Sequence, residues 1–257
     1  MTPDEDSRTR ATVGLLKRVP NGLVNMGSPF HPREWPLSSH FIPEFEIAHA
    51  PVTVSQYAVF LEDGGYNDRA WWDDEGWAWI LGRIDGWGRA DRLQPDRWAI
   101  QRRRAFHPVV SVTWYEACAY CAWLSERTKQ TVRLAFEEEW ERAARGDDRR
   151  PFPWGEEFSP EFTNTLESDR RDTVAAASLE GDRSPFGVLE LAGNVQEWTA
   201  SDYSPLEGEV FPYGPLKVVR GGSFNDTIYG ARTSYRRAYP PGYFFPFLGF
   251  RVVVALR

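Results

Sequence analysis

Apolar and polar residues alternate along several short stretches of the chain. GLVNMGS at 22–28 and the beginning of FEIAHAPVTVSQYAVFLE at 45–62 alternate in the way that half-buried strands do. After Thr53 the second stretch changes to a helical spacing, which predicts a helix over 54–61 with Thr53 as its N-cap. KVVRGGSF at 217–224 and GFRVVVAL at 249–256 are two further predicted strands.

Two more helices are indicated in the middle of the chain. HPVVSVTWYEACAYCAWLSERT at 107–128 predicts a strand, a turn and a helix, with Thr113 and Glu116 as a capping box. LAFEEEWERAARG at 134–146 predicts a helix that Gly146 ends. Cys118 and Cys121 lie one turn apart on the first helix among apolar residues, which favours two core thiols over a redox or zinc pair.

The remaining stretches predict loops around a single core. Residues 64–107 hold six of the twelve tryptophans, and residues 147–193 are broken by proline and glycine turns. With 21 glycines and 19 prolines, the chain is typical of a compact fold that is rich in loops. We expect a flexible N-terminus over 1–20 and one domain over 21–257.

The charge and hydropathy of the chain exclude some classes of function. A net charge of −7 and a pI near 5.3 argue against general nucleic-acid binding. No apolar run reaches the ~20 residues that a membrane span needs. The first residues, MTPDEDSRTR, lack the apolar run of a secretory signal, so we expect a cytoplasmic protein.

Eight short motifs occur along the chain in an order that resembles one known family. They are NMGS, APVTVSQYAVF, HPVVSVTWYEACAYCAWL, RLAFEEEWERAARG, FPWG, GNVQEWT, RGGSF and GFRVV. Together they are similar to the formylglycine-generating-enzyme (sulfatase-modifying factor) family, over about residues 20–257. The resemblance implies an α+β fold: one C-type-lectin-like domain with little regular secondary structure and long loops.

The family resemblance also implies chemistry that this chain does not match. Family enzymes that make formylglycine carry two copper-binding cysteines after the RGGSF-like motif, where this chain has Asp226 and Gly230 or Ala231. Another branch uses iron and a separate helical domain that supplies histidines. The histidines of this chain lack paired spacing; they are His31, His40, His49 and His107. We therefore expect a protein without enzymatic activity.

A third branch of the family, the variable proteins of diversity-generating retroelements, matches the C-terminal motifs better. These proteins end in a fixed frame around positions that adenine-directed mutagenesis diversifies, typically to NNC codons. Such codons cannot encode Lys, Glu, Gln, Met or Trp, and residues 225–247 contain none of these, although they make up 43 of the 257 residues. The frame that the resemblance implies consists of Arg220, Gly221, Gly222, Arg232, Arg236 and Arg251.

The segment 225–247 is the predicted ligand-binding surface. Its composition, rich in aromatic residues, Gly, Ser, Thr and Arg, is that of an antibody paratope. Three arginines against one aspartate suggest that an acidic ligand would suit it, and the expected partner is an unidentified protein or other macromolecule. The predicted contact residues are Asn225, Asp226, Thr227, Ile228, Tyr229, Gly230, Tyr235, Arg237, Tyr239, Gly242, Tyr243, Phe244, Phe245 and Phe247.

Two alternatives stay open at this point. Asn194 and Glu197 match a motif that holds a structural calcium in family enzymes, but they could equally bond the loop backbone without metal, and no other cofactor is expected. The chain could also be a formylglycine-generating-enzyme-like protein without the copper pair, with a fixed ligand or an unassigned activity. Only a diversified protein needs a template repeat and a reverse transcriptase beside its gene.

Overall fold

The described residues form three β-sheets. The computed structural model describes residues 14–83, 92–204 and 214–256. The first sheet is antiparallel, in the order β1-β4-β10-β5. The second consists of β2 and β3, and the third has the order β8-β7-β6-β9, in which β6 and β9 run parallel. The strands are β1 (Leu16–Val19), β2 (Gly22–Met26), β3 (Ser38–Ile42), β4 (Phe45–Ala48), β5 (Val132–Leu134), β6 (Gln196–Asp202), β7 (Lys217–Arg220), β8 (Arg236–Tyr239), β9 (Leu248–Phe250) and β10 (Val252–Ala255).

The three helices that the sequence predicted have the capping residues expected. Thr53 forms a capping box with Gln56 at the start of α2, and Thr113 forms another with Glu116 at the start of α5. Gly146, at φ 75°, ends α6, as a glycine in the left-handed region commonly does. The helices are α2 (Val54–Glu62), α3 (Asp74–Ile80), α4 (Trp98–Gln101), α5 (Trp114–Thr128) and α6 (Glu137–Arg145), with 3₁₀ turns η1 (Pro32–Glu34), η2 (Arg69–Trp71) and η3 (Leu166–Ser168).

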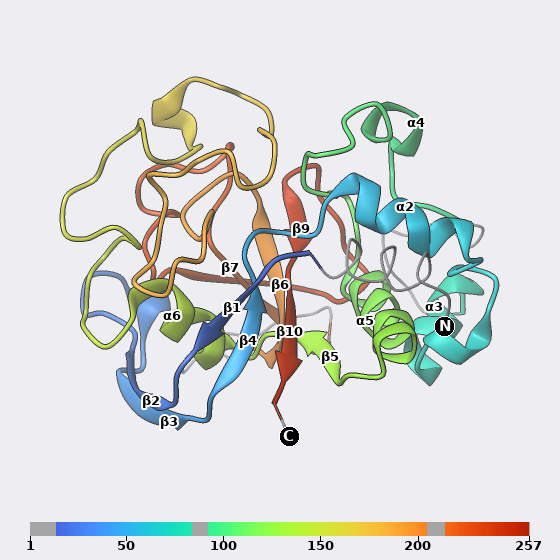
Figure 1. Ribbon diagram of the computed structural model, residues 1–257, viewed down its shortest axis with the longest axis horizontal. Coiled ribbons are helices and arrows are strands. Elements are labelled where there is room, and N and C mark those ends of the chain that lie inside the picture. The colour runs from blue at the N-terminus through green and yellow to red at the C-terminus, as the bar shows by residue number, and fades with distance from the viewer. Residues whose placement is uncertain (1–13, 84–91, 205–213, 257) are drawn as a thin grey trace.

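The strand β10 is buried on both faces of the first sheet, and α6 and α5 flank this sheet (Figure 1). Val252 and Val254 of β10 pack into a core with the aromatic residues of α2 and α5, whereas Val253 packs on the other side with Trp140 of α6. Because side chains alternate along a strand, three consecutive valines supply two cores. The predicted mixed α+β architecture with long loops is confirmed.

Three of our sequence-based boundaries need correction. Residues 16–19 are not flexible: they form β1, which pairs with β4 over its whole length and buries Val19. The remainder of the predicted flexible N-terminus, 1–13, lies outside the described residues. The predicted strand at His107–Val110 is only an isolated bridge between Thr53 and Pro108. The tryptophan-rich stretch predicted as loop contains short helices, although residues 84–91 lie outside the described part.

The two cysteines are core thiols, as predicted. Both are free and lie within α5, and burial raises the pKa of each. Neither is therefore a reactive thiolate near neutral pH. Among the described residues, no helix combines the length and the apolar character that crossing a membrane requires.

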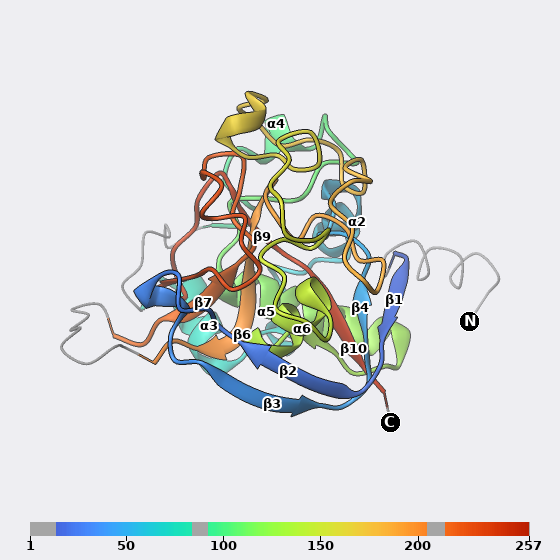
Figure 2. The same cartoon turned by 90° about the vertical axis from the view of Figure 1, so that its left-hand side faces the viewer.

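The third sheet positions the segment predicted to bind a ligand. The segment 225–247 begins shortly after β7, contains β8 and ends directly before β9. All three strands belong to the third sheet, which therefore holds the segment at both ends and in its middle. In Figures 1 and 2 part of its orange-red loops lies on the side of the molecule that also carries α6 and the β2–β3 pair, whereas Pro241 reaches the first residue of α5.

Candidate ligand-binding surface

Arg220 fastens the beginning of the segment to α6. Its buried guanidinium pairs with Glu137 at 3.1 Å and with Glu141 at 2.5 Å, both on α6. The same group donates to the backbone oxygens of Thr233 at 2.6 Å and of Ser234 at 3.2 Å. One planar donor fork therefore joins a strand, a helix and the returning loop, which a lysine could not do.

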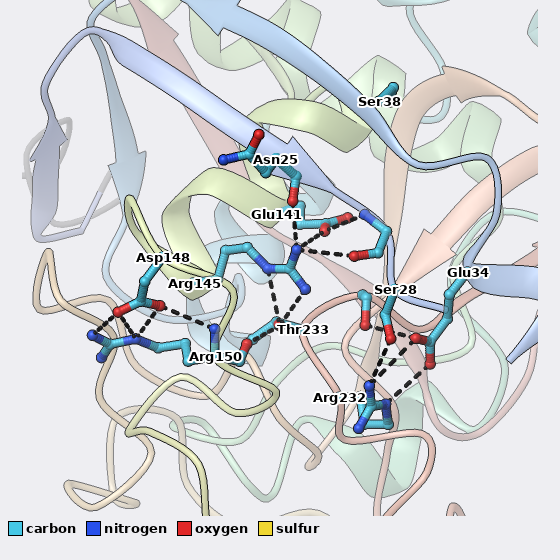
Figure 3. A network of polar contacts seen from close by, with 12 residues as sticks. Asn25, Ser28, Glu34, Ser38, Glu141, Arg145, Asp148, Arg150, Arg232 and Thr233 are labelled. Atoms are coloured by element: carbon cyan, nitrogen blue, oxygen red, sulfur yellow. Dashed lines mark hydrogen bonds and ion pairs between the residues drawn. The ribbon is translucent and has the colours of Figure 1, made fainter. Parts of the chain in front are cut away.

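A continuous chain of alternating charges extends from this point. Arg145 pairs with Glu141 at 2.9 Å, and Arg236 pairs with Glu137 at 2.7 Å, so that Arg145, Glu141, Arg220, Glu137 and Arg236 follow one another. The guanidinium of Arg145 also contacts the hydroxyl of Thr233 in the segment (Figure 3). Each buried charge has an opposite neighbour, which is the condition for keeping it ionised out of water.

A second buried carboxylate fixes the middle of the segment. Glu34 of η1, 1% exposed, accepts from Arg232 at 3.1 Å and from the Ser234 hydroxyl at 2.9 Å. Arg232 also donates to the hydroxyl of Ser28 at 3.0 Å (Figure 3). The loop 27–36 and the segment are thus joined by a charge-assisted network across about 200 residues of sequence.

Two glycines let the chain turn directly after Arg220. Gly221 and Gly222 have φ of 93° and 65°, in the region that side chains other than glycine seldom adopt. A Cβ on Gly222 would lie 2.5 Å from the backbone oxygen of Gly230. The RGGSF motif therefore places an anchoring arginine next to a turn that only glycine accommodates.

Glu197 is engaged by protein donors. Arg251 contacts both of its carboxylate oxygens at 2.6 and 2.7 Å, and Trp140 donates to it at 2.8 Å. Arg251 also donates to the backbone oxygens of Ala48, Leu189 and Glu190. The last framework arginine thus ties β10 to the loop before β6.

Asn194 makes a separate set of contacts. Its side-chain oxygen accepts from Val174 N at 3.0 Å and from Asn164 at 3.2 Å, and its amide donates to Glu190 at 2.9 Å. The described residues include no group of three or more His, Cys, Asp or Glu placed to hold a metal ion. Calcium at Asn194 and Glu197 stays a prediction.

Aromatic side chains gather on the outside of this framework. Tyr229 is 57% exposed and stacks on Phe30, which is 60% exposed, with ring centroids 6.0 Å apart. Tyr235 contacts His31 at the same centroid distance, and Trp35 is 49% exposed nearby on the loop that Arg236 contacts. We call Phe30, His31, Trp35, Tyr229 and Tyr235 the aromatic face.

Three of the five residues of the aromatic face escaped the sequence analysis. Phe30, His31 and Trp35 lie about 200 residues before their partners, and no periodicity or motif connects the two regions. The structure brings them together through the buried contact between Glu34 and Arg232. The sequence around Glu34 gives no sign of this contact, because the burial of Glu34 depends on tertiary packing.

Several predicted contact residues do not reach the surface. Asp226, Gly230 and Gly242 are buried, so the prediction is wrong for these three. The carboxylate of Asp226 accepts from Ser223 at 2.6 Å and from Gln196 at 2.8 Å, because it closes the turn after the glycines. A side chain on Gly230 would collide with Asp226 at 2.8 Å.

Other predicted contacts are partly buried against the core. Tyr239 packs on Phe245, with ring centroids 4.8 Å apart, and on Trp198 of β6; both Tyr239 and Phe245 border the larger core. Phe247 stacks on Phe245 at 5.3 Å. The exposed residues of the segment are Asn225, Thr227, Tyr229 and Pro246, while Ile228, Tyr235, Arg237, Tyr243 and Phe244 are half-buried.

The positive charge of the segment is neutralised by neighbouring carboxylates. Arg232 pairs with Glu34, Arg236 with Glu137, and Arg237 with Asp226 at 2.6 Å. Burial lowers the pKa of Arg237, but hydrogen bonding to Tyr239 and the charge of Asp226 outweigh this effect and raise it. The surface therefore does not favour an acidic ligand. The count of charges within the segment suggested otherwise, because two of the three neutralising carboxylates, Glu34 and Glu137, lie outside the segment.

Comparison with known proteins agrees with the motifs. Residues 2–256 match the family described as the sulfatase-modifying factor enzyme 1-like domain. An inactive C-alpha-formylglycine-generating enzyme 2 of Bos taurus is 30% identical, over 93% of this chain and 87% of the relative. A solved structure of Treponema denticola variable protein 1 has a TM-score of 0.65 at 18% identity, covering 93% of this chain and 94% of that one, which shows a shared fold.

Another relative corrects our expectation about enzymatic activity. A hercynine oxygenase of Mycolicibacterium thermoresistibile is 30% identical over 76% of this chain. The name is that of an enzyme, so the missing copper cysteines do not exclude enzymatic activity for this chain, and the expectation drawn from them was wrong. This chain spans 47% of the length of that relative, or about half of it.

Proposed function

Because this chain belongs to the sulfatase-modifying factor enzyme 1-like family, we propose that it binds a macromolecular ligand through the C-terminal part of that fold. The binding surface consists of the aromatic face together with the outer side chains of residues 225–247. The ligand that this surface recognises is a protein.

One observation carries the proposal: buried carboxylates fix the backbone of the segment, while several aromatic side chains in and beside it remain exposed. Arg220, Arg232 and Arg236 bind the segment to buried carboxylates on α6 and η1. Tyr229, Phe30 and Trp35 remain about half exposed or more. A surface ordered before binding loses less conformational entropy when it binds, and tyrosine and tryptophan supply large contact areas with few rotatable bonds.

The chemistry of the surface favours a protein. Exposed aromatic rings at the centre and ion-paired arginines around them resemble the composition of protein interfaces, where Tyr, Trp and Arg dominate the binding energy. Neutralisation of Arg232, Arg236 and Arg237 within the chain removes the charge that a phosphate-rich or acidic ligand would need.

We further propose that residues 225–247 are diversified by a retroelement. Two facts support this. The segment lacks all five residue types that NNC codons cannot encode. Arg220 and Arg232 bind the backbone of the segment and a buried carboxylate through their guanidinium groups. Exchange of the exposed side chains of the segment would leave these contacts in place.

The DNA that flanks the gene tests this proposal. We expect a near-copy of the stretch encoding Arg220–Val253 within a few kilobases, beside a reverse-transcriptase gene. Its differences from the gene should fall at template adenines and should concentrate in the codons of Asn225, Thr227, Tyr229, Tyr235 and Tyr243. The codons of Arg220, Gly221 and Gly222 serve as the internal control and should be identical in both copies.

Two outcomes would contradict diversification. Without a repeat, the segment is a fixed site, as in the alternative of a family protein with one constant ligand. A repeat whose differences fall equally on frame codons and outer codons would show ordinary drift, because selection for the frame would then be absent.

A further inference from the structure

A cavity of about 140 Å³ lies on the far side of the segment, between α4 and the chain at 107–111. Val54, Val110 and Pro246 form apolar parts of its wall. An apolar cavity of roughly 150 Å³ in another protein holds benzene, so the volume suits a compact group of about six heavy atoms. None of the residues of the aromatic face lines it.

The wall of the cavity is built rigidly around Gln101. The side chain of Gln101 donates to the backbone oxygen of Val110 at 3.0 Å and accepts from its N–H at 3.1 Å. This reciprocal pair ties α4 to the opposite wall. Arg97 and Ser111, which also line the cavity, both have positive φ, at 54° and 57°. Strained backbone of this kind concentrates at binding sites.

His107 brings a polar group to the cavity. Its Nδ1 lies 2.9 Å from the hydroxyl of Thr173, and the residue forms part of the cavity wall. Burial and the neighbouring Arg104 lower the pKa of His107, while Asp172 raises it by less. The ring is therefore neutral near pH 7, and Nε2–H can donate when Nδ1 accepts from Thr173.

The rim of the cavity is cationic, although the protein carries a net charge of −7. Arg104 is paired with Asp172 at 2.6 Å, whereas Arg97 has its nearest carboxylate, Asp96, at 3.8 Å and a side chain that is 71% exposed. Arg102 and Arg103 follow on the exposed turn, with no ion pair to any described residue. Arg97 is thus a charged lining residue whose guanidinium can bind a ligand carboxylate, because its ion pair with Asp96 is long and exposed.

We propose that this cavity binds a small organic anion, with a compact apolar group inside and a carboxylate between Arg97 and His107. The geometry combines a half-open, largely apolar pocket with the donor side chains of Arg97 and His107 in its lining, which is the usual construction of a small-molecule site. This inference is independent of the proposed binding by residues 225–247. Loss of one would leave the other intact, because the two sites share no lining residue except Pro246 of the segment.

Benzoate is the probe that tests the site, by titration calorimetry on the full chain. We expect a Kd on the order of 1 mM or tighter, and clearly weaker binding of benzyl alcohol and benzylamine, which have the same ring without the carboxylate. R97Q should weaken benzoate binding about tenfold, since a hydrogen bond to a charged group is lost. R103Q removes the same charge from an exposed residue outside the lining and should leave the affinity within about twofold.

A second readout locates the ligand. Benzoate should shift the side-chain ¹⁵N signals of His107 and leave those of His40, on the distant β3, unchanged. The inference is overturned if benzyl alcohol binds as tightly as benzoate, if R97Q and R103Q weaken binding equally, or if the His107 signals do not move at saturation. Absence of any heat or shift with benzoate on the wild-type chain would also overturn it.

Discussion

The side chains of the segment divide into those that hold it and those that it presents. Tyr229 is 57% exposed, whereas Tyr239, ten residues later, packs between Trp198 and Phe245. Both are tyrosines in one irregular stretch, and composition alone predicts the same role for them. The difference arises because Tyr239 belongs to β8, whose pairing with β7 turns the ring toward β6.

Single substitutions of these tyrosines should therefore separate stability from binding. We expect Tyr239→Ala to lower the free energy of unfolding by about 2–3 kcal/mol, through the lost aromatic packing. Tyr229→Ala should change it by less than about 0.5 kcal/mol, as surface substitutions usually do. Urea denaturation measures both. An equal loss in the two variants would show that Tyr229 is part of the core and would remove it from the proposed surface.

At the level of elements, α6 is the base on which the segment rests. Its acidic residues Glu137 and Glu141 pair with Arg220 at the start of the segment, and its Arg145 contacts the hydroxyl of Thr233. Its Trp140 packs in the same core as Val253 of β10. A helix with charged residues this deeply buried is unusual, because isolated buried charges are costly. Here three arginines and two glutamates alternate, and the network holds two loops and a strand in one arrangement.

Breaking the centre of this network should be severe. Glu141→Gln leaves Arg145 and Arg220 buried with one negative charge fewer, and we expect a loss of about 3–5 kcal/mol in the free energy of unfolding. Glu126→Gln is the matched control, since it removes the exposed ion pair with Lys129 on α5 and should cost less than about 1 kcal/mol. Thermal and urea unfolding would check both; similar small losses would mean that the network contributes little to the fold.

At the level of the whole molecule, the last strand closes the structure. β10 lies between β4, from the beginning of the chain, and β5, from its middle. Its valines fill both cores. Arg251, directly before it, connects the strand to the loop that carries Asn194. The segment 225–247 is thus followed by residues that complete the fold, so it lies between strands that pair within the protein.

Truncation tests this dependence on the last strand. A chain ending at Arg251 lacks β10 and should show no cooperative unfolding transition, because two strands lose their pairing and both cores lose their central valines. A chain ending at Ala255 keeps the pairing and should unfold cooperatively, with a Tm within a few degrees of the intact protein. A cooperative transition in the shorter chain would show that the strand is dispensable.

The sequence by itself determined the elements whose causes are local. Thr53, Thr113 and Gly146 mark helix ends through hydrogen bonds and backbone angles that involve only a few neighbouring residues. The eight motifs in order determined the family and the α+β fold. The alternation of GFRVVVAL predicted a strand, although not that both of its faces are buried.

Tertiary structure decided which residues meet. The partners of the segment arginines lie as far as about 200 residues away, so neither their neutralised charge nor the pairing of Phe30 with Tyr229 follows from local pattern. Burial of Asp226, Gly230 and Gly242 likewise depends on how the loop returns to the sheet. Periodicity reports the side of an element on which a residue lies, whereas contact across the molecule depends on how all the elements pack, and a single sequence does not display that.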